Sequence, residues 1–153
     1  MLMSNYLVNK KGVNFRMTTH AQTAKAIREE LKKAFPNVSF SVKSFSFSMG
    51  DDVRIEWTNG PTTEQVENIT KKYEYGTFDG MTDLYEIDNK RNDIPQVKYI
   101  ITSRKITEDI KEKTAQEIAD RFGFDRNDQK AWMEKLGEWE QQAVYKKLKD
   151  VEL

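Results

Sequence analysis

Hydrophobic and polar residues alternate along two neighbouring stretches in the first half of the chain. Apolar side chains occupy every second position of residues 38–42, and the same period of two recurs in residues 53–57. This period is typical of strands with one buried face. Between them, the segment 49–52 reads Met-Gly-Asp-Asp, which suits a turn because Gly accepts positive φ and Asp bonds its own backbone. Residues 37–61 therefore predict a β-hairpin.

The apolar positions of the first strand change parity partway along it. They fall on even numbers up to Val42 and then on Phe45 and Phe47. A β-bulge at Lys43 and Ser44 would return both rings to the buried face. Without a bulge, the two rings point to the opposite face and need a second cover. The pattern leaves both alternatives open.

Two segments that flank this hairpin have helical periodicity. Thr18 and Thr19 are expected to cap a helix over about 20–35. A second helix is expected over about 61–73, opening on Pro61 because the fixed φ of proline suits the first helical position. We expect the apolar stripes of both helices to pack against the hairpin. These stripes are Ala24, Ile27, Leu31 and Ala34 in the first helix and Val66, Ile69 and Tyr73 in the second.

Two further strands are predicted after the second helix. Gly and Asp residues favour a turn that leads into a short strand at about 84–87. A polar linker, residues 89–95, is followed by a strand at 96–106, in which Val97, Tyr99 and Ile101 alternate with their neighbours. The predicted class is α+β, with order α-β-β-α-β-β and a small antiparallel-rich sheet that carries helices on one face.

The C-terminal third predicts an antiparallel helical hairpin. Its first helix begins after Thr107 and ends at Gly123, and its second begins near residue 125 or 128. The apolar stripes are Ile110, Thr114, Ile118 and Phe122, then Trp132, Leu136, Trp139 and Ala143. The hairpin either covers the second face of the sheet or pairs with another copy to form a homodimer. This divides the chain into an arm at 1–17, an α+β domain at 18–106 and the hairpin at 107–153.

Composition narrows the possible functions. The chain has no net charge, so overall charge does not argue for a nucleic-acid or membrane partner. Residues 1–36, however, hold 7 Lys and Arg against 2 Asp and Glu, which hints at a polyanion partner. The absence of cysteine excludes disulfides and thiolate chemistry. No apolar run is long enough for a membrane span or a secretory signal, so we expect a cytoplasmic protein.

Candidate catalytic chemistry is sparse. The single histidine, His20, falls at a helix start, and no nucleophile motif accompanies it. Five aspartates are best explained as turn residues, because no EF-hand or Walker motif contains them. These are Asp51, Asp52, Asp79, Asp83 and Asp88. We expect no catalytic residue, no metal and no cofactor, while an enzyme with an acidic metal site stays as a minor hypothesis.

One stretch resembles a known family. The runs TAKAIREELKKAFPNVSFSVKS, DDVRIEWTNGPT, TEQVENITKKY and FDGMTDLYE are similar to a large polyvalent protein associated domain, over about residues 19–87. The most specific parts are Trp57 with Gly60-Pro61, and the cluster Phe78-Asp79-Gly80-Met81. Domains of this kind occur in proteins of phages and conjugative elements. The resemblance implies an origin in a mobile element and brings no catalytic residues.

The leading hypothesis is a non-enzymatic binding protein that docks on a host or element protein, with counter-defence of the anti-restriction or anti-CRISPR type as one role. Its candidate partner contacts are Phe78, Asp79, Met81, Trp132 and Trp139. The alternative is a nucleic-acid-binding module that uses the basic N-terminal third. Its candidate contacts are Lys10, Lys11, Arg16, Lys25, Arg28, Lys32, Lys33, Lys43 and Arg54.

Overall fold

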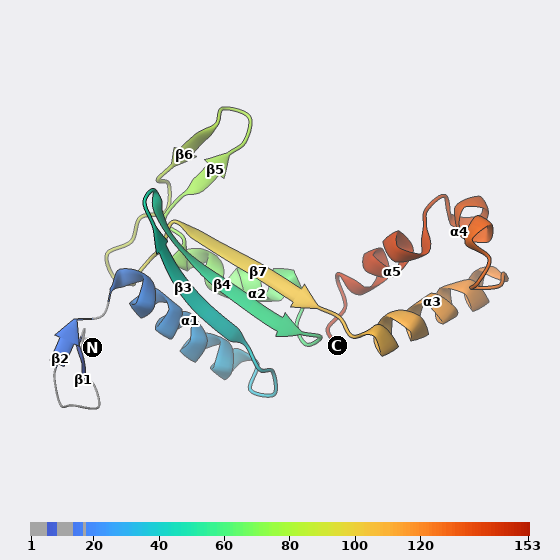
Figure 1. Ribbon diagram of the computed structural model, residues 1–153, viewed down its shortest axis with the longest axis horizontal. Coiled ribbons are helices and arrows are strands. Elements are labelled where there is room, and N and C mark those ends of the chain that lie inside the picture. Colours follow the sequence, from blue (N-terminus) through green and yellow to red (C-terminus); the bar gives the residue numbers. More distant parts are fainter. Residues whose placement is uncertain (1–5, 9–13, 17) are drawn as a thin grey trace.

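The computed structural model describes residues 6–8, 14–16 and 18–153 and confirms the α+β class (Figure 1). Its elements follow roughly the predicted order, with one more strand after the second helix and one more helix in the C-terminal third. The elements are β1 (Tyr6–Val8), β2 (Asn14–Arg16), α1 (Thr19–Ala34), β3 (Ser41–Phe47), β4 (Gly50–Thr58), α2 (Thr63–Thr70), the 3₁₀ turn η1 (Lys71–Tyr73), β5 (Thr77–Asp79), β6 (Leu84–Glu86), β7 (Tyr99–Lys105), α3 (Glu108–Phe122), α4 (Gln129–Leu136) and α5 (Glu140–Leu148). None of the helices in this part of the chain combines the length and apolar composition needed to cross a membrane.

A three-stranded sheet with the order β3-β4-β7 forms the centre of the molecule. β3 and β4 are antiparallel, as the predicted hairpin requires, whereas β7 is parallel to β4. The chain crosses from β4 to β7 through α2 and the β5–β6 hairpin, and such a crossover brings a strand back in the same direction. The central sheet is therefore mixed, and the described pairs β1–β2, β3–β4 and β5–β6 are antiparallel.

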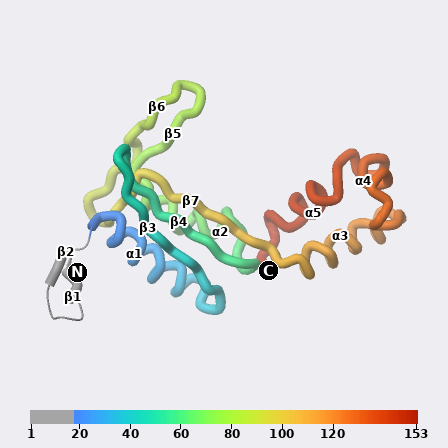
Figure 2. Tube along the Cα trace, viewed as in Figure 1, coloured from blue at the N-terminus to red at the C-terminus, as the bar shows by residue number. Residues whose placement is uncertain are grey.

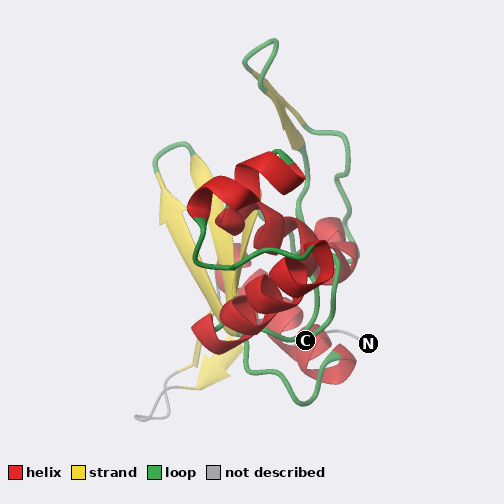
Figure 3. Cartoon of the chain, turned by 90° about the vertical axis from the view of Figure 1, so that its right-hand side faces the viewer, coloured by secondary structure: helices red, strands yellow, loops and turns green. Residues whose placement is uncertain are grey.

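Both helices of the α+β part pack on one face of this sheet, which we call the inner face. Its buried core holds Ala24, Ile27, Leu31, Val42, Val53, Ile55, Trp57, Val66, Tyr73 and Val97. The predicted stripes thus meet the hairpin as expected, except that Ala34, in the last turn of α1, is exposed. In Figure 3 the long strands form the left edge of the molecule, and the helices gather to their right.

The parity change in β3 is a two-faced strand and not a bulge. The register with β4 advances one residue at a time from Ser41↔Glu56 to Phe47↔Gly50. Val42 is consequently buried on the inner face, while Phe45 and Phe47 lie on the opposite, outer face, where they are 40% and 43% exposed. The C-terminal helices do not cover them, so the predicted second cover is absent within the described residues.

β7 is shorter than predicted, and its faces are reversed. It begins at Tyr99 and pairs Val53 with Ile100, which places Ile100 against the core. Ile101, expected to share the face of Val97, is exposed on the outer face. The reversal follows from the parallel register, because each residue of β7 faces the same side as its partner on β4.

The second helix starts later than predicted. Its first helical residue is Thr63 and not Pro61. Thr62 is the N-cap, and its hydroxyl accepts a hydrogen bond from the amide of Gln65 at 3.1 Å. The Gln65 side chain in turn accepts from the Thr62 amide at 2.8 Å, which completes a capping box. Pro61 lies just before the cap, and its carbonyl accepts the indole N–H of Trp57 at 3.0 Å. Trp57 and the Asn59-Gly60-Pro61 turn are thereby joined.

Replacing Gly60 by Ala should lower the free energy of unfolding by about 2 kcal/mol. Gly60 has a φ of +59°, and an added Cβ would lie 3.0 Å from Cγ2 of Val38. Gly123 is the matched control because its φ is +72° and nothing lies within 4 Å of its Cβ position. Gly123→Ala should therefore cost only the backbone strain, about 1 kcal/mol. Equal losses in urea denaturation would contradict the close approach to Val38.

The C-terminal third contains three helices and not two. Gly137 adopts a φ of +72° and ends α4, so the predicted second helix is divided into α4 and α5. α3 and α5 pack against each other around a second core, which contains Ala115, Ile118, Ala119, Trp132, Ala143, Val144 and Leu148. Phe122, predicted on the buried stripe, is exposed at the end of α3.

Candidate binding surfaces

The β5–β6 hairpin projects from the sheet as an apolar arm (Figure 1). Phe78 is 50% exposed and Met81 is 96% exposed, and Leu84 and Ile87 are exposed beside them. Asp79 shapes the turn at the tip, since its carboxylate accepts from the Met81 amide and the Thr82 hydroxyl, both at 2.9 Å. The Met81 amide, more than the hydroxyl, lowers the pKa of Asp79. Phe78, Asp79 and Met81, predicted as partner contacts, are therefore neighbours on one protruding element.

The base of the arm is fixed to the sheet. The Tyr85 ring lies edge-on to Tyr75 and Tyr99, with centroids 5.9 and 5.4 Å away, and its hydroxyl donates to the Lys98 carbonyl at 2.7 Å. Burial of the Tyr85 side chain among these groups raises the pKa of its hydroxyl. A Cβ added at Gly76 would overlap the Glu86 carbonyl oxygen, so the chain just before β5 approaches β6 closely. The arm thus holds its tip away from the sheet on a defined base.

The outer face of the sheet is the second exposed surface. It carries the rings of Phe45 and Phe47, with Ile101 on β7. Arg54 lies over the Phe45 ring, with its guanidinium carbon 4.3 Å from the centroid. The buried Asp52 carboxylate holds the same guanidinium through Oδ2, at 3.1 Å from Nη2 and 3.3 Å from Nε. The outer face therefore combines aromatic rings with a positioned cation.

The structure brings together some of the predicted basic residues. Lys43 pairs in register with Arg54, so both lie on the outer face. On α1, the Arg28 guanidinium donates to the Val42 carbonyl at 2.7 Å, which sets that helix beside β3. Lys25 and Lys32 are exposed one turn away on either side of Arg28. Lys33 is exposed on α1 as well, whereas Lys10, Lys11 and the side chain of Arg16 lie outside the described residues.

The two tryptophans of the C-terminal third occupy opposite environments. Trp132 is 0% exposed, and its indole donates to the Arg126 carbonyl at 2.9 Å. It is thus a core residue, which corrects its prediction as a partner contact. Trp139 is 50% exposed at the N-cap of α5 and is available at the surface. Its separation from Trp132 follows from the break at Gly137.

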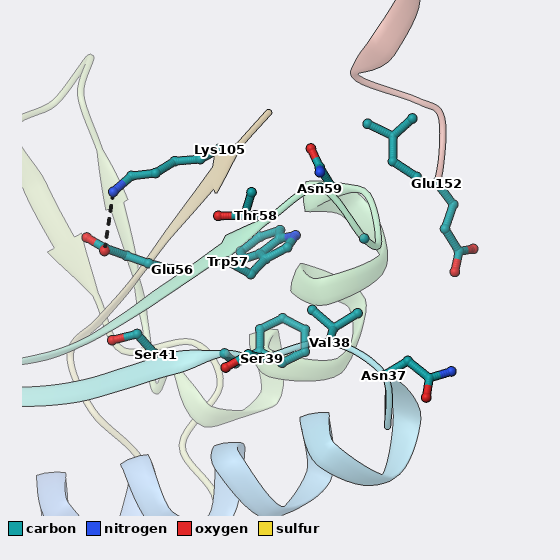
Figure 4. Close-up of a pocket in the computed structure, with 13 residues that line it drawn as sticks. Asn37, Val38, Ser39, Ser41, Glu56, Trp57, Thr58, Asn59, Lys105 and Glu152 are labelled. Atoms are coloured by element: carbon teal, nitrogen blue, oxygen red, sulfur yellow. Dashed lines mark ion pairs between the residues drawn. The ribbon is translucent and has the colours of Figure 1, made fainter. Parts of the chain in front are cut away.

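A hollow of about 720 Å³ opens where the chain before β3 diverges from the end of β4 (Figure 4). Trp57 and Val38 line it, Glu56 and Lys105 face each other at 3.9 Å on one side, and Glu152 lies at its other end. The lining mixes apolar and polar groups, and the described residues hold no cluster of three or more His, Asp or Glu that suits a metal ion. His20 does not reach this hollow, since its ring nitrogen lies 2.9 Å from the Ser44 hydroxyl.

The aspartates considered for a metal site are dispersed. The Asp51 carboxylate accepts from the Lys98 amide at 2.9 Å, and Asp88 accepts from the Thr77 hydroxyl at 3.1 Å. Asp83 adopts a φ of +55° in the arm's turn. Asp51 and Asp52 lie in β4 and not in a turn, whereas Asp79 and Asp83 shape the turn of the arm, as their interpretation as turn residues predicts.

Arg104 is a structural centre that the sequence reasoning missed. Its guanidinium donates to the carbonyls of Asn59 at 3.1 Å and Gly60 at 3.0 Å, and to those of Leu148 at 3.1 Å and Val151 at 2.7 Å. Burial lowers the pKa of Arg104. In the sequence, its position in a predicted strand is the one feature that could have drawn attention to it. The side chain joins the turn after β4 to the end of α5, and Figure 2 shows the chain returning to this point.

Comparison with known families finds a match over residues 18–110, to a family described as Large polyvalent protein associated domain 29. The matched range begins at the N-cap of α1 and ends in the first turn of α3. It therefore includes the sheet, the helices on its inner face and the arm. No curated protein and no solved structure matches the chain significantly.

Proposed function

The chain belongs to the large polyvalent protein associated domain 29 family, which confirms the resemblance seen in its sequence and indicates a phage or mobile-element protein, and on this basis we propose that it is a non-enzymatic binding protein. It docks on a protein of the host or of the element through the β5–β6 arm. The bacterial cytoplasm is the expected site of action, and counter-defence is the expected role.

The arm is the observation that carries this proposal. An isolated hairpin with Phe78, Met81, Leu84 and Ile87 exposed keeps apolar surface in water without contributing to either core. Exposed apolar groups gathered on one element are typical of interaction sites. Met and Phe are also enriched at protein interfaces, where they supply buried anchors. The partner is therefore expected to offer an apolar pocket for the tip of the arm.

The fixed base of the arm supports the same proposal. Tyr85 is held by two rings and by the Lys98 carbonyl, so the arm is oriented before it meets a partner. A preorganised element loses less conformational entropy on binding than a disordered one. Trp139, exposed on the C-terminal helices, is a further candidate contact, and self-association through those helices is the alternative use of that region.

The test begins with a photo-crosslinking residue at position 81 of the full chain, incubated in host lysate. The crosslinked protein is identified by mass spectrometry, purified and titrated against the unmodified chain. Phe78→Glu and Met81→Glu should each weaken binding at least about tenfold, because a charge would have to be buried in an apolar pocket.

Phe122→Glu and Met133→Glu are the matched controls, since both residues are exposed on the C-terminal helices. They should bind the purified partner as the unmodified chain does. Recovery of no specific protein, or equal affinity for the arm variants and the controls, would refute docking through the arm. Light scattering of the purified chain separately measures whether it forms a homodimer.

A further inference from the structure

We propose that the outer face of the β3-β4-β7 sheet binds single-stranded nucleic acid, with Phe45 and Phe47 stacking on bases and Lys43 and Arg54 contacting phosphates. This surface differs from the arm and goes beyond the proposed function. It exists because β3 has no bulge, so that its two Phe side chains leave the core. Within the described residues, no helix covers them.

The rings have the spacing that an extended strand of nucleotides needs. Phe45 and Phe47 are two residues apart on one β-strand, which separates them by about 6.7 Å along β3. Bases of an unstacked single strand can each lie on a separate ring at such a distance, and every base has a π-face for the contact. Sheet faces with exposed aromatic side chains serve this purpose in known RNA-binding modules.

Arg54 is held in place for this contact. Its guanidinium is bound by Asp52 on one side and lies on the Phe45 ring. Because a planar guanidinium stacks on bases and also donates to phosphates, the Phe45–Arg54 pair offers both kinds of contact at one point. Fixing the side chain in advance removes part of the entropy cost of binding.

The cations around this face exceed the acids that could oppose them. Lys43 pairs in register with Arg54 and has no ion pair with a described residue. The basic side of α1, with Lys25, Arg28 and Lys32, lies along the adjacent edge through the Arg28 contact to Val42. The nearby acids are Asp52, which already pairs with Arg54, Glu29 on α1, and Glu56, whose carboxylate lies 3.9 Å from Lys105. Lys43 and the three cations of α1 are the charges that remain in excess. This excess suits a phosphate backbone and explains why the occupant is a polyanion and not an apolar peptide.

The test measures fluorescence anisotropy of a labelled oligothymidylate of about 15 nucleotides with the full chain. Binding is expected at about 50 mM salt and should weaken steeply towards about 200 mM. Phe45→Ala and Phe47→Ala should each weaken binding about tenfold. Lys43→Ala should make the slope of log affinity against log salt concentration shallower, by the amount that corresponds to about one phosphate contact.

Phe122→Ala and Lys113→Ala are the matched controls, because both residues are exposed on α3, and neither should change the affinity. Phe45→Leu and Phe47→Leu keep apolar area without a ring, so they should bind weakly even if the Ala variants lose stability. A duplex of the same length should bind less tightly, since its base faces are hidden. Absence of binding at low salt, equal affinity for the duplex, or unchanged affinity in the Leu variants would overturn the proposal.

Discussion

Replacing Trp132 by Ala should lower the free energy of unfolding of the C-terminal helices by about 3–5 kcal/mol. The side chain is fully buried in the second core. Its ring lies edge-on to Phe124 with centroids 5.0 Å apart, and its indole N–H is satisfied by the Arg126 carbonyl. The substitution therefore leaves a large cavity and an unpaired carbonyl in a small core. Urea denaturation followed by circular dichroism measures the loss.

Trp139→Ala is the matched control, because it removes the same side chain from an exposed position. It should change stability by less than about 1 kcal/mol. A comparable loss in both variants would mean that Trp139 is also packed, and that α4 and α5 form the continuous helix that the sequence predicts. Thermal melts of the two variants side by side separate these outcomes.

Arg104→Ala should cost about 3 kcal/mol and loosen the C-terminal helices from the sheet. One guanidinium satisfies four backbone carbonyls, two in the turn after β4, one at the end of α5 and one beyond it. Removing it leaves these acceptors without their charged donor. The Leu153 amide still reaches the Gly60 carbonyl at 2.8 Å, so the contact is weakened rather than abolished. Amide hydrogen exchange at residues 59–60 and 148–153 should become faster.

Arg104→Lys keeps the charge but has a single nitrogen, which cannot reach all four carbonyls. It should recover less than half of the lost stability. Lys105→Ala is the neighbouring control, since that side chain is exposed and makes only a 3.9 Å pair with Glu56. Full rescue by Lys would show that charge, and not the geometry of the guanidinium, holds the two parts together.

The elements with strong local signals were predictable from the sequence. The α1 stripe has spacings of three and four up to Leu31, and the residues of β4 alternate cleanly from Val53 to Trp57, so the packing of α1 on β4 follows from periodicity alone. Thr18 and Thr107 are also predicted as N-caps, because the preference for an N-cap depends on residues that are neighbours in the sequence. The family resemblance singles out Phe78, Asp79 and Met81 as one cluster, and the structure places all three on the arm.

The remaining features depend on long-range contacts. The change of parity among the apolar residues of β3 is compatible with a bulge or with a two-faced strand. Only the register with β4 distinguishes the two. The parallel pairing of β7 reverses its faces, which no local pattern reports. The helix break at Gly137 is not predicted, because apolar spacing continues across it from Trp132 to Ala143. Arg104 looked like an ordinary strand residue, since its four acceptors are distant in sequence.

Hydroxyl-radical footprinting of the full chain most directly tests the central claim, that one face of the sheet is covered by helices while the other face and the arm stay open. Mass spectrometry measures the oxidation rate of each aromatic and Met side chain. The structure predicts fast oxidation of Phe45, Phe47 and Met81, and protection of Trp57 and Trp132. Protection of Phe45 and Phe47 equal to that of Trp57 would show that the outer face is covered, and would contradict the account.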